Sequence, residues 1–379
     1  MANGAPTITE LTSTHFGLFV SFTGIPQPDL FTWFWLRDHS EDAASLNQST
    51  LQRQVDTFTL PHRPSPGDAS FDNAGNVVVR WNDGSSDGLF SPARLARAAG
   101  RDVAPTNQHL WTSGDFSPGT ALPYDAVLTN DNALRDLLTR VRDVGFGLVA
   151  AVTRTPEGAA DLAARIGPVR SSIFGTMWPL SSSVKAHDDT AYTNSYLEPH
   201  TDSTYCIDAP GLQLFVCLER DGSGGDSVLV DGFAIAAALR HQDPKAFETL
   251  TTVSVPGHYV EPGVHLTASR PPIRLDADGN VVQVSFNNYD RAPFRLPEPQ
   301  MTEFYRAYGE LHRRIVDRSG WFAVRLEPGD ALVFDNWRCL HGRLEYTGTR
   351  VFEGCYHNRE DFESKLRVLS ELGAVAVAR

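Results

Sequence analysis

The 379-residue sequence has few cysteines and no excess of positive charge, and each shortage excludes a class of protein. Its four cysteines show no paired spacing and lie among apolar residues, which is typical of reduced thiols in the core of a cytoplasmic protein. Asp and Glu number 46 against 33 Lys and Arg, so the net charge is −13. This balance argues against nucleic acid and anionic membranes as partners, because both bind basic surfaces.

Long apolar runs and nucleotide-binding loops are missing as well. No run approaches the roughly 18 apolar residues of a membrane span. The N-terminus has neither a basic flank nor an apolar stretch, so we expect no secretory signal, no transit peptide and a cytoplasmic location. The sequence contains no GxGxxG or Walker motif, which leaves dinucleotide and nucleoside triphosphate chemistry without support.

The length and the distribution of turn residues predict two domains. Residues 1–105 are predicted to form a small β-rich domain, in which the aromatic segment 30–38 is expected to be a strand. Residues 106–123 are rich in Pro, Gly and Ser and are predicted to be a linker. Residues 124–379 form the second predicted domain.

The second domain begins with helical patterns and continues as strands. Leucine and valine recur at helical spacing within 131–144, and 156–167 is a second predicted helix. Beyond residue 200 the chain consists of many short apolar segments separated by Gly-rich turns. We therefore predict a mainly β (α+β) fold, a sandwich or jelly roll with flanking helices rather than a parallel nucleotide-binding sheet.

The first candidate site is the tripeptide His200-Thr201-Asp202. In a strand, residues i and i+2 point to the same face, so an imidazole and a carboxylate would project together. A distant histidine would complete a triad of two histidines and one carboxylate, which suits Fe(II) and leaves coordination positions open. The pattern alone is weak, because about 1.5 matches are expected by chance and four occur. A surface turn or a hydrogen-bonded core histidine is the alternative.

The second candidate segment is ALVFDNWRCLHGR, residues 331–343, which supplies His341. Arg350 follows at the start of another predicted strand. A 2-keto acid that chelates iron at one end presents a carboxylate at the other, and a guanidinium can bind that carboxylate through two hydrogen bonds. Taken alone, Arg350 is better explained by a surface ion pair.

Several motifs occur together in one order along nearly the whole chain. By these motifs the sequence resembles the γ-butyrobetaine and trimethyllysine dioxygenase family, whose members are Fe(II)- and 2-oxoglutarate-dependent hydroxylases. The motifs are WLRDH, FGTMW, DDTAYT, HTD, PGLQLFVCL, GGDSVLVDGF, NNYDR, FDNWRCLHGR and EGCY.

The resemblance implies a double-stranded β-helix (jelly-roll) catalytic domain, usually in a homodimer, that uses O2 and 2-oxoglutarate. It implies that His200, Asp202 and His341 are iron ligands and that Arg350 binds 2-oxoglutarate. Ser227 is a second implied contact to 2-oxoglutarate, with a simple turn residue as the alternative.

The sequence departs from the family pattern in the N-terminal domain. Relatives often carry a zinc site there, with cysteines soon after the WLRD motif. This chain has Ser40 and no cysteine in that region, so the thiolates of a closed zinc site are missing. We therefore predict that the protein binds no zinc.

The resemblance also implies an aromatic cage for a trimethylammonium group, made by Phe174, Trp178, Tyr192 and Tyr356. A quaternary ammonium ion donates no hydrogen bond, so aromatic faces are its natural partners. Phe174 and Trp178 would share a face if their segment were helical. Phe174 replaces a tyrosine of the relatives, and the alternative for all four residues is a place in the core.

Two polar residues bear on the choice of substrate. The family's trimethyllysine enzymes have an aspartate where this chain has Asp189, and it would pair with the substrate α-ammonium group, while Asn287 would bind the substrate carboxylate. We therefore expect hydroxylation of N6-trimethyllysine at C3, a reaction of carnitine biosynthesis. A γ-butyrobetaine or trimethylammonium-phosphonate hydroxylase is the alternative, and a non-catalytic jelly-roll protein that binds betaines is the alternative from another class. For Asp189 itself, a helix cap or an exposed turn is the other interpretation.

Overall fold

The structure is a computed structural model that describes residues 7–101, 108–113, 119–181 and 192–377, with the backbone alone at 371–377. The chain divides into two compact units, Met1–Thr106 and Asn107–Arg379. Each unit is described by itself. None of the helices in the described ranges is both long enough and apolar enough to cross a bilayer.

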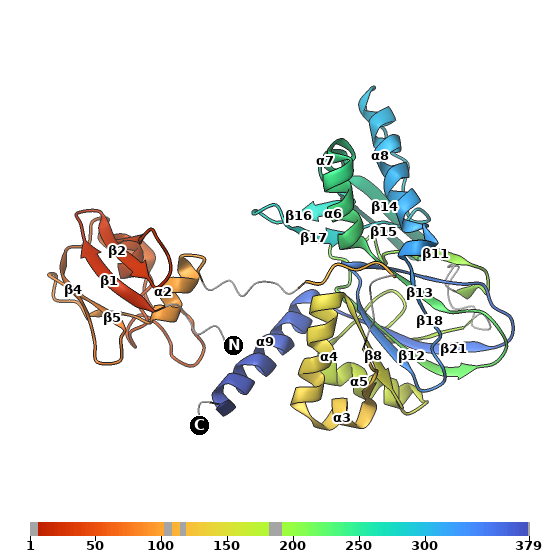
Figure 1. Cartoon of the computed structure of the whole chain (residues 1–379), viewed down its shortest axis with the longest axis horizontal. Coiled ribbons are helices and arrows are strands. Elements are labelled where there is room, and N and C mark those ends of the chain that lie inside the picture. The colour runs from red at the N-terminus through yellow and green to blue at the C-terminus, as the bar shows by residue number, and fades with distance from the viewer. Residues whose placement is uncertain (1–6, 102–107, 114–118, 182–191, 378–379) are drawn as a thin grey trace. The chain divides into compact units, whose positions relative to one another are not determined.

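The N-terminal unit contains two three-stranded antiparallel sheets and two short helices (Figure 1). Its core is formed by side chains such as Leu18, Val79 and Phe90. Only part of the aromatic segment predicted as a strand is one, because Thr32 accepts a hydrogen bond from the Trp35 amide and thereby caps a helix. The elements are β1 (Ile8–Ser13), β2 (Gly17–Phe22), β3 (Asp29–Thr32), α1 (Trp33–Asp38), β4 (Pro66–Phe71), β5 (Val77–Trp81), β6 (Gly88–Phe90) and α2 (Pro92–Ala98).

The second unit is built on a large sheet with the strand order β10-β21-β12-β19-β8-β7, to which β9 adds beside β21. All of its pairs are antiparallel except that of β7 with β8. Its strands are β7 (Leu122–Pro123), β8 (Phe146–Ala150), β9 (Val169–Arg170), β10 (Met177–Leu180), β12 (Leu212–Arg220), β19 (Ala331–Asp335) and β21 (Arg350–His357).

A smaller antiparallel sheet, β11-β20-β13-β18, packs against the large one. A buried cluster joins the two sheets, with Phe334 and Phe352 from the large sheet and Leu229 and Cys339 from the small one. The two facing sheets form the predicted sandwich, and the flanking helices make the fold α+β. The strands of the small sheet are β11 (Leu197–His200), β13 (Ser227–Asp231), β18 (Phe322–Val324) and β20 (Cys339–Arg343).

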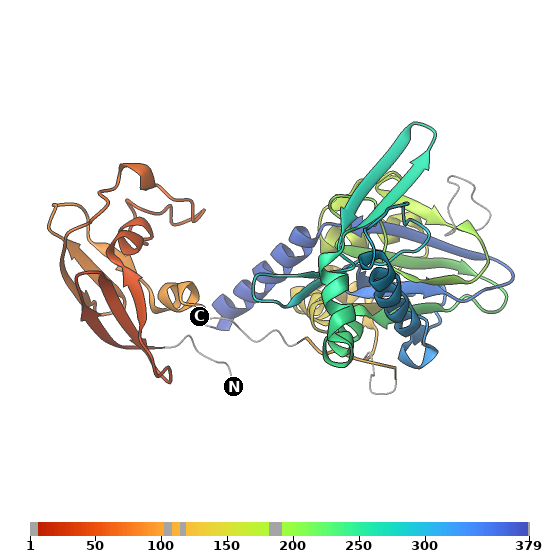
Figure 2. The same ribbon diagram turned by 90° about the horizontal axis from the view of Figure 1, so that it is seen from above.

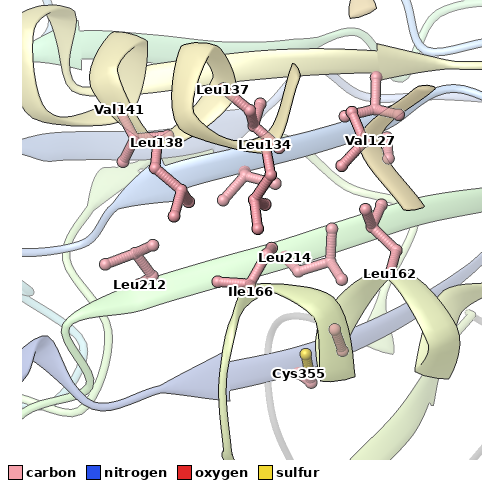
Figure 3. Close-up of a cluster of buried hydrophobic side chains, with 14 of the residues drawn as sticks. Val127, Leu134, Leu137, Leu138, Val141, Leu162, Ile166, Leu212, Leu214 and Cys355 are labelled. Carbon is pink, nitrogen blue, oxygen red and sulfur yellow. The ribbon is translucent and has the colours of Figure 1, made fainter. Parts of the chain in front are cut away.

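Helices cover the outer face of the large sheet. Leu134, Leu138 and Val141 of α4 pack toward Leu212 and Leu214 of β12 (Figure 3). Asn130 caps the start of α4, as its sequence predicts. The helices of this layer are α3 (Tyr124–Thr129), α4 (Asp131–Val144), α5 (Pro156–Ile166) and α9 (Arg359–Val377).

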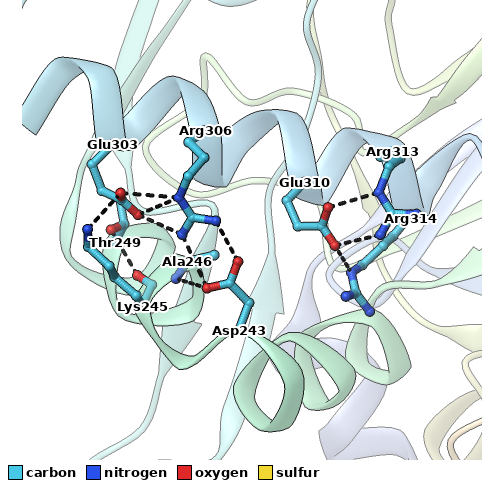
Figure 4. A network of polar contacts seen from close by, with 9 residues as sticks. All are labelled: Asp243, Lys245, Ala246, Thr249, Glu303, Arg306, Glu310, Arg313 and Arg314. Atoms are coloured by element: carbon cyan, nitrogen blue, oxygen red, sulfur yellow. Dashed lines mark hydrogen bonds and ion pairs between the residues drawn. The ribbon is translucent and has the colours of Figure 1, made fainter.

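A second helical group covers the small sheet and carries two hairpins. Its core includes Phe247, Phe286, Phe304 and Leu311. Figure 4 shows ion pairs that join α8 to the start of α7, among them Arg306 with Asp243, which caps α7. Figure 2 shows the longer hairpin, made of β14 and β15, projecting from the body of the unit. The elements are α6 (Gly232–Gln242), α7 (Pro244–Thr252), β14 (Val255–Glu261), β15 (Val264–Arg270), β16 (Ile273–Leu275), β17 (Val281–Val284) and α8 (Gln300–Ile315).

Candidate active site

Strand pairing in the small sheet brings His200, Asp202 and His341 together. His200 is the last residue of β11 and lies opposite His341 of β20. Oδ1 of Asp202 is 3.2 Å from Nε2 of His200 and 3.6 Å from Nε2 of His341. Ligand atoms of the three residues all lie within 4.8 Å of one another, and in the described ranges no other such group is found.

Asp202 does not lie in a strand, contrary to the simple alternation expected from sequence. β11 ends at His200, and Ser203 has a φ of 58°, in the left-handed region. The Asp202 carboxylate therefore reaches the two imidazoles from a turn that follows the strand.

Hydrogen bonds to neighbouring groups occupy the outer atoms of His200 and Asp202, so the atoms that face the centre of the triad are available as metal ligands. Nδ1 of His200 lies 2.7 Å from the carbonyl oxygen of Glu198, so Nδ1–H donates there and Nε2 carries the lone pair. The hydroxyl of Tyr356 donates to Oδ2 of Asp202 at 2.6 Å, which leaves Oδ1 for the centre. Two imidazole nitrogens and one carboxylate oxygen form a donor set that suits Fe(II).

Burial and mutual charge set the protonation of the triad. Burial alone would raise the pKa of Asp202, but His341, His200 and the Tyr356 hydroxyl lower it overall. Burial lowers the pKa of His341 to about 4, against the attraction of Asp202. Burial also opposes the charged form of His200, but a hydrogen bond to Asp202 and its charge raise the pKa of His200 overall by favouring a proton on Nε2. Nε2 would release that proton on binding a metal ion at the centre, to which it would offer its lone pair. Asp202 is thus ionised and His341 neutral near pH 7, which are the forms that bind a metal.

Arg350 is a buried cation at another wall of the same cavity. Its residue is 6% exposed, and Nη2 donates to the Ser227 hydroxyl at 3.4 Å. Its Nε has no hydrogen-bond partner among the residues that the structure describes. Burial and the charge of Arg343 lower the pKa of Arg350 to about 9. A buried guanidinium with unused donors is suited to bind an anion.

Aromatic side chains line the cavity beside the triad. The ring centroids of Phe174 and Trp178 are 6.1 Å apart, and those of Trp178 and Tyr356 are 4.5 Å apart. Tyr192 lines the same cavity. The spacing of Phe174 and Trp178 would place them on one face of a helix, but they do not lie on one. Trp178 belongs to β10 and lies opposite Gly354 of β21. A Cβ at Gly354 would come within 3.0 Å of the Trp178 indole, so glycine makes room for the ring.

Of the two polar residues expected to select the substrate, the structure describes one. Asn287 lines the cavity, and Asp189 lies outside the described residues. Sequence reasoning missed Tyr205, Asp290 and Asn336, although each lies in or next to a motif that it had singled out. Tyr205 and Asp290 line the cavity, and Asn336 holds the backbone of Asp202.

In the N-terminal unit, Ser40 lies after α1, in the segment where the sequence lacks the cysteines of a zinc site. Its hydroxyl oxygen accepts a hydrogen bond from the Leu89 amide at 2.8 Å. Ser40 thus links the chain after α1 to β6. That the protein binds no zinc stays a prediction.

Comparison with known proteins places the chain in a family. The profile described as "Taurine catabolism dioxygenase TauD, TfdA family" matches residues 105–356. The chain belongs to this family. This dioxygenase is 2-oxoglutarate-dependent and uses Fe(II), and the interpretation as a non-catalytic betaine-binding protein is therefore not retained.

Curated relatives match this dioxygenase over most of their length. It is 32% identical to the mitochondrial trimethyllysine dioxygenase of Gallus gallus over 349 residues, which cover 89% of this chain and 83% of that protein. It is 33% identical to the gamma-butyrobetaine dioxygenase of Pseudomonas sp. (strain AK-1) over 344 residues, which cover 88% and 89%. It is 29% identical to the trimethyllysine dioxygenase of Meyerozyma guilliermondii over 368 residues, which cover 90% of each chain. The resemblance noted from the motifs is confirmed.

Proposed function

We propose that this dioxygenase hydroxylates a small molecule that carries a trimethylammonium group, and that its substrate is N6-trimethyllysine, hydroxylated at C3. The observation that carries the proposal is the set of rings of Phe174, Trp178 and Tyr356 in the cavity that contains the triad. Each suitably placed ring contributes about 0.5–2 kcal/mol to the binding of a cation. Tyr192 completes the proposed cage.

His200, Asp202 and His341 would hold Fe(II) through two imidazole nitrogens and one carboxylate oxygen. The chemistry that bound Fe(II) supplies is the reaction of O2 with 2-oxoglutarate, which yields succinate and CO2 while a substrate C–H bond becomes C–OH. The protein's own contribution is to keep His200 in the tautomer with its lone pair on Nε2, through the Glu198 carbonyl, and to keep Asp202 ionised.

Arg350 would bind the far carboxylate of 2-oxoglutarate, with the Ser227 hydroxyl as a second donor. The 3.4 Å contact between these two side chains supports a shared anion site, since both present donors at one place. Apolar side chains, including Phe215 and Leu332, line the cavity as well. They exclude water from the charged contact and so strengthen it.

The trimethyllysine assignment depends on residues that contact the other end of the substrate. Asn287 would donate to the substrate carboxylate, and Asp189 would attract its α-ammonium group. Relatives named trimethyllysine dioxygenase and gamma-butyrobetaine dioxygenase support both candidate substrates. A carboxylate at position 189 favours the amino acid, because it would repel the carboxylate of a bare betaine. A trimethylammonium phosphonate would meet the same repulsion.

The decisive experiment is an oxygen-consumption assay with Fe(II), 2-oxoglutarate and a panel of amines. We expect trimethyllysine to stimulate O2 uptake with equal amounts of succinate and of a product that has gained one oxygen atom at C3. Unmethylated lysine is the matched control and should not be hydroxylated. His341→Ala should abolish turnover. The proposal fails if no quaternary amine stimulates uptake, or if lysine serves as well as trimethyllysine.

We also propose that the protein is a homodimer, from the resemblance, and that it is located in the cytoplasm, from its N-terminal sequence and its cysteines. Light scattering on the purified protein tests the first point, and the mass of a single chain would contradict it. Fractionation of the source cells tests the second.

A further inference from the structure

The cavity contains a carboxylate that the triad does not use. Among the described residues that line it, two are acidic, Asp202 and Asp290. Asp202 belongs to the triad. Asp290 lies in the loop between β17 and α8, far from the triad in sequence.

Hydrogen bonds join Asp290 to Asn287 and to Thr204, which follows the triad residue Asp202 in the chain. Its Oδ2 accepts from Nδ2 of Asn287 at 2.9 Å and from the hydroxyl of Thr204 at 3.1 Å. Oδ1 of Asn287 in turn accepts from the Tyr289 amide at 3.0 Å. The amide of Asn287 is thus oriented, and one of the two N–H groups on Nδ2 remains to donate to a ligand.

These contacts place a hydrogen-bond donor beside a carboxylate. A carboxylate adds attraction for a cation, and it accepts up to about four hydrogen bonds. A neighbouring donor and anion together match a ligand that has a carboxylate and an ammonium group on one carbon atom.

We propose that Asp290 and Asn287 together recognise the α-amino acid end of the substrate, with Asp290 as a second carboxylate, besides Asp189, for the α-ammonium group and with Asn287 as the donor to the α-carboxylate. This inference rests on the proposed function and makes its substrate class specific. It selects an amino acid over a betaine that lacks the ammonium group.

The position of Asp290 relative to the triad agrees with the expected site of hydroxylation. Thr204 is two residues beyond Asp202, and its hydroxyl bonds Asp290 directly. The amino acid end of the substrate is thereby held next to the triad. C3 of an amino acid is bonded to the carbon that bears both charged groups, so it lies near the reacting centre, while the trimethylammonium group extends toward the aromatic rings.

The test compares two ligands that differ only in the α-ammonium group, trimethyllysine and 6-(trimethylammonio)hexanoate. Their dissociation constants are measured by calorimetry on the protein loaded with 2-oxoglutarate and a redox-inert divalent metal. Asp290→Asn should weaken trimethyllysine by about 10–100-fold, as expected for loss of a charged hydrogen bond. It should change the hexanoate by less than about 3-fold. Steady-state kinetics should show the same split in KM.

Thr204→Val is the matched control, because it removes a donor to Asp290 without changing charge. It should affect both ligands equally and weakly. Asp290→Ser replaces Asp290→Asn if the latter lowers the melting temperature. Equal weakening of both ligands in the Asp290 variant would mean that Asp290 only orients Asn287, and it would overturn the inference. Unchanged binding of both would also overturn it. If the wild-type protein hydroxylates no trimethylammonium compound, the proposed function itself has failed.

Discussion

The side chain of Asn336 holds Asp202 by its backbone. Oδ1 of Asn336 accepts from the Asp202 amide at 2.8 Å, and Nδ2 donates to the Asp202 carbonyl at 3.3 Å and to the Pro210 carbonyl at 3.0 Å. Asn336 is 1% exposed. Because Asp202 lies beyond the end of β11, sheet hydrogen bonds do not fix its position, and this one amide takes their place.

Asn336→Ala should therefore weaken metal binding. We expect a loss of about 10–100-fold in affinity, which is the usual effect of removing a group that orients a ligand. Titration with Mn(II), followed by electron paramagnetic resonance, measures it, and the melting temperature of the metal-free protein separates this effect from instability. Asn280→Ala, in the exposed turn before β17, is the control. Equal affinities for the two variants would contradict the role of Asn336.

Tyr356→Phe separates the two contacts of Tyr356. The phenyl ring remains beside Trp178, but the hydroxyl that donates to Asp202 is lost. We expect metal affinity to fall by about 10-fold, with the KM for the quaternary amine changed by less than about 3-fold because the ring face is kept. Phe174→Ala is the complementary variant and should raise KM without altering metal affinity. A large rise in KM for Tyr356→Phe would contradict this division.

Arg350→Met should stabilise the protein without ligands and weaken its binding of 2-oxoglutarate. The guanidinium is buried, and burial lowers its pKa to about 9, so its charge is poorly compensated. An apolar side chain of similar length removes that cost, commonly about 1–4 kcal/mol. Binding of 2-oxoglutarate should weaken by about 2–5 kcal/mol. Thermal melts with and without 2-oxoglutarate measure both effects. A variant that 2-oxoglutarate still stabilises as strongly as wild type would refute the assignment of Arg350.

Glu353→Gln should stabilise the protein relative to wild type, and this gain should be larger at alkaline than at acidic pH. Burial, and then the charge of Glu157, raise the pKa of Glu353 above its usual 4.5. Because the folded state binds this proton more tightly than the unfolded chain, the stability that Glu353 contributes is lost as the pH rises above 4.5 and through the folded pKa. Urea unfolding at pH 5 and pH 8 measures the difference. An advantage for the variant that shrinks with rising pH would contradict the direction of the shift.

Much of the local structure follows from local sequence. The helix at 131–144 is predicted by its apolar spacing and by the cap at Asn130, and both are present. Aromatic residues mislead in one place. The segment Trp33–Asp38 was expected to be a strand, because aromatic side chains favour strands in general, and here the helix cap at Thr32 overrides that preference. For α8 no prediction was made, although Phe304, Tyr308 and Leu311 have helical spacing.

The site was predictable to the extent that its residues lie in recognisable motifs. His200, Asp202 and His341 come together because β11 pairs with β20, and no spacing along the chain reports that pairing. The tie between Thr204 and Asp290, 86 residues apart, is likewise set by the fold. Sequence motifs indicated the regions of the site. Only the hydrogen bonds of the folded structure identified Asp290 and Asn336 as the residues within these regions that matter.

Tyr356 serves the triad with its oxygen and the cavity with its ring, so evolution cannot adjust these two tasks separately at this position. A change of preferred substrate through Tyr356 would disturb the carboxylate of Asp202, which we propose as a metal ligand. The ring of Phe174 lies beside those of Trp178 and Tyr259, so a change of this ring leaves the hydrogen bond to Asp202 intact. Divergence in this family is therefore expected to accumulate at the Phe174 side of the cavity, with the Tyr356 side held constant.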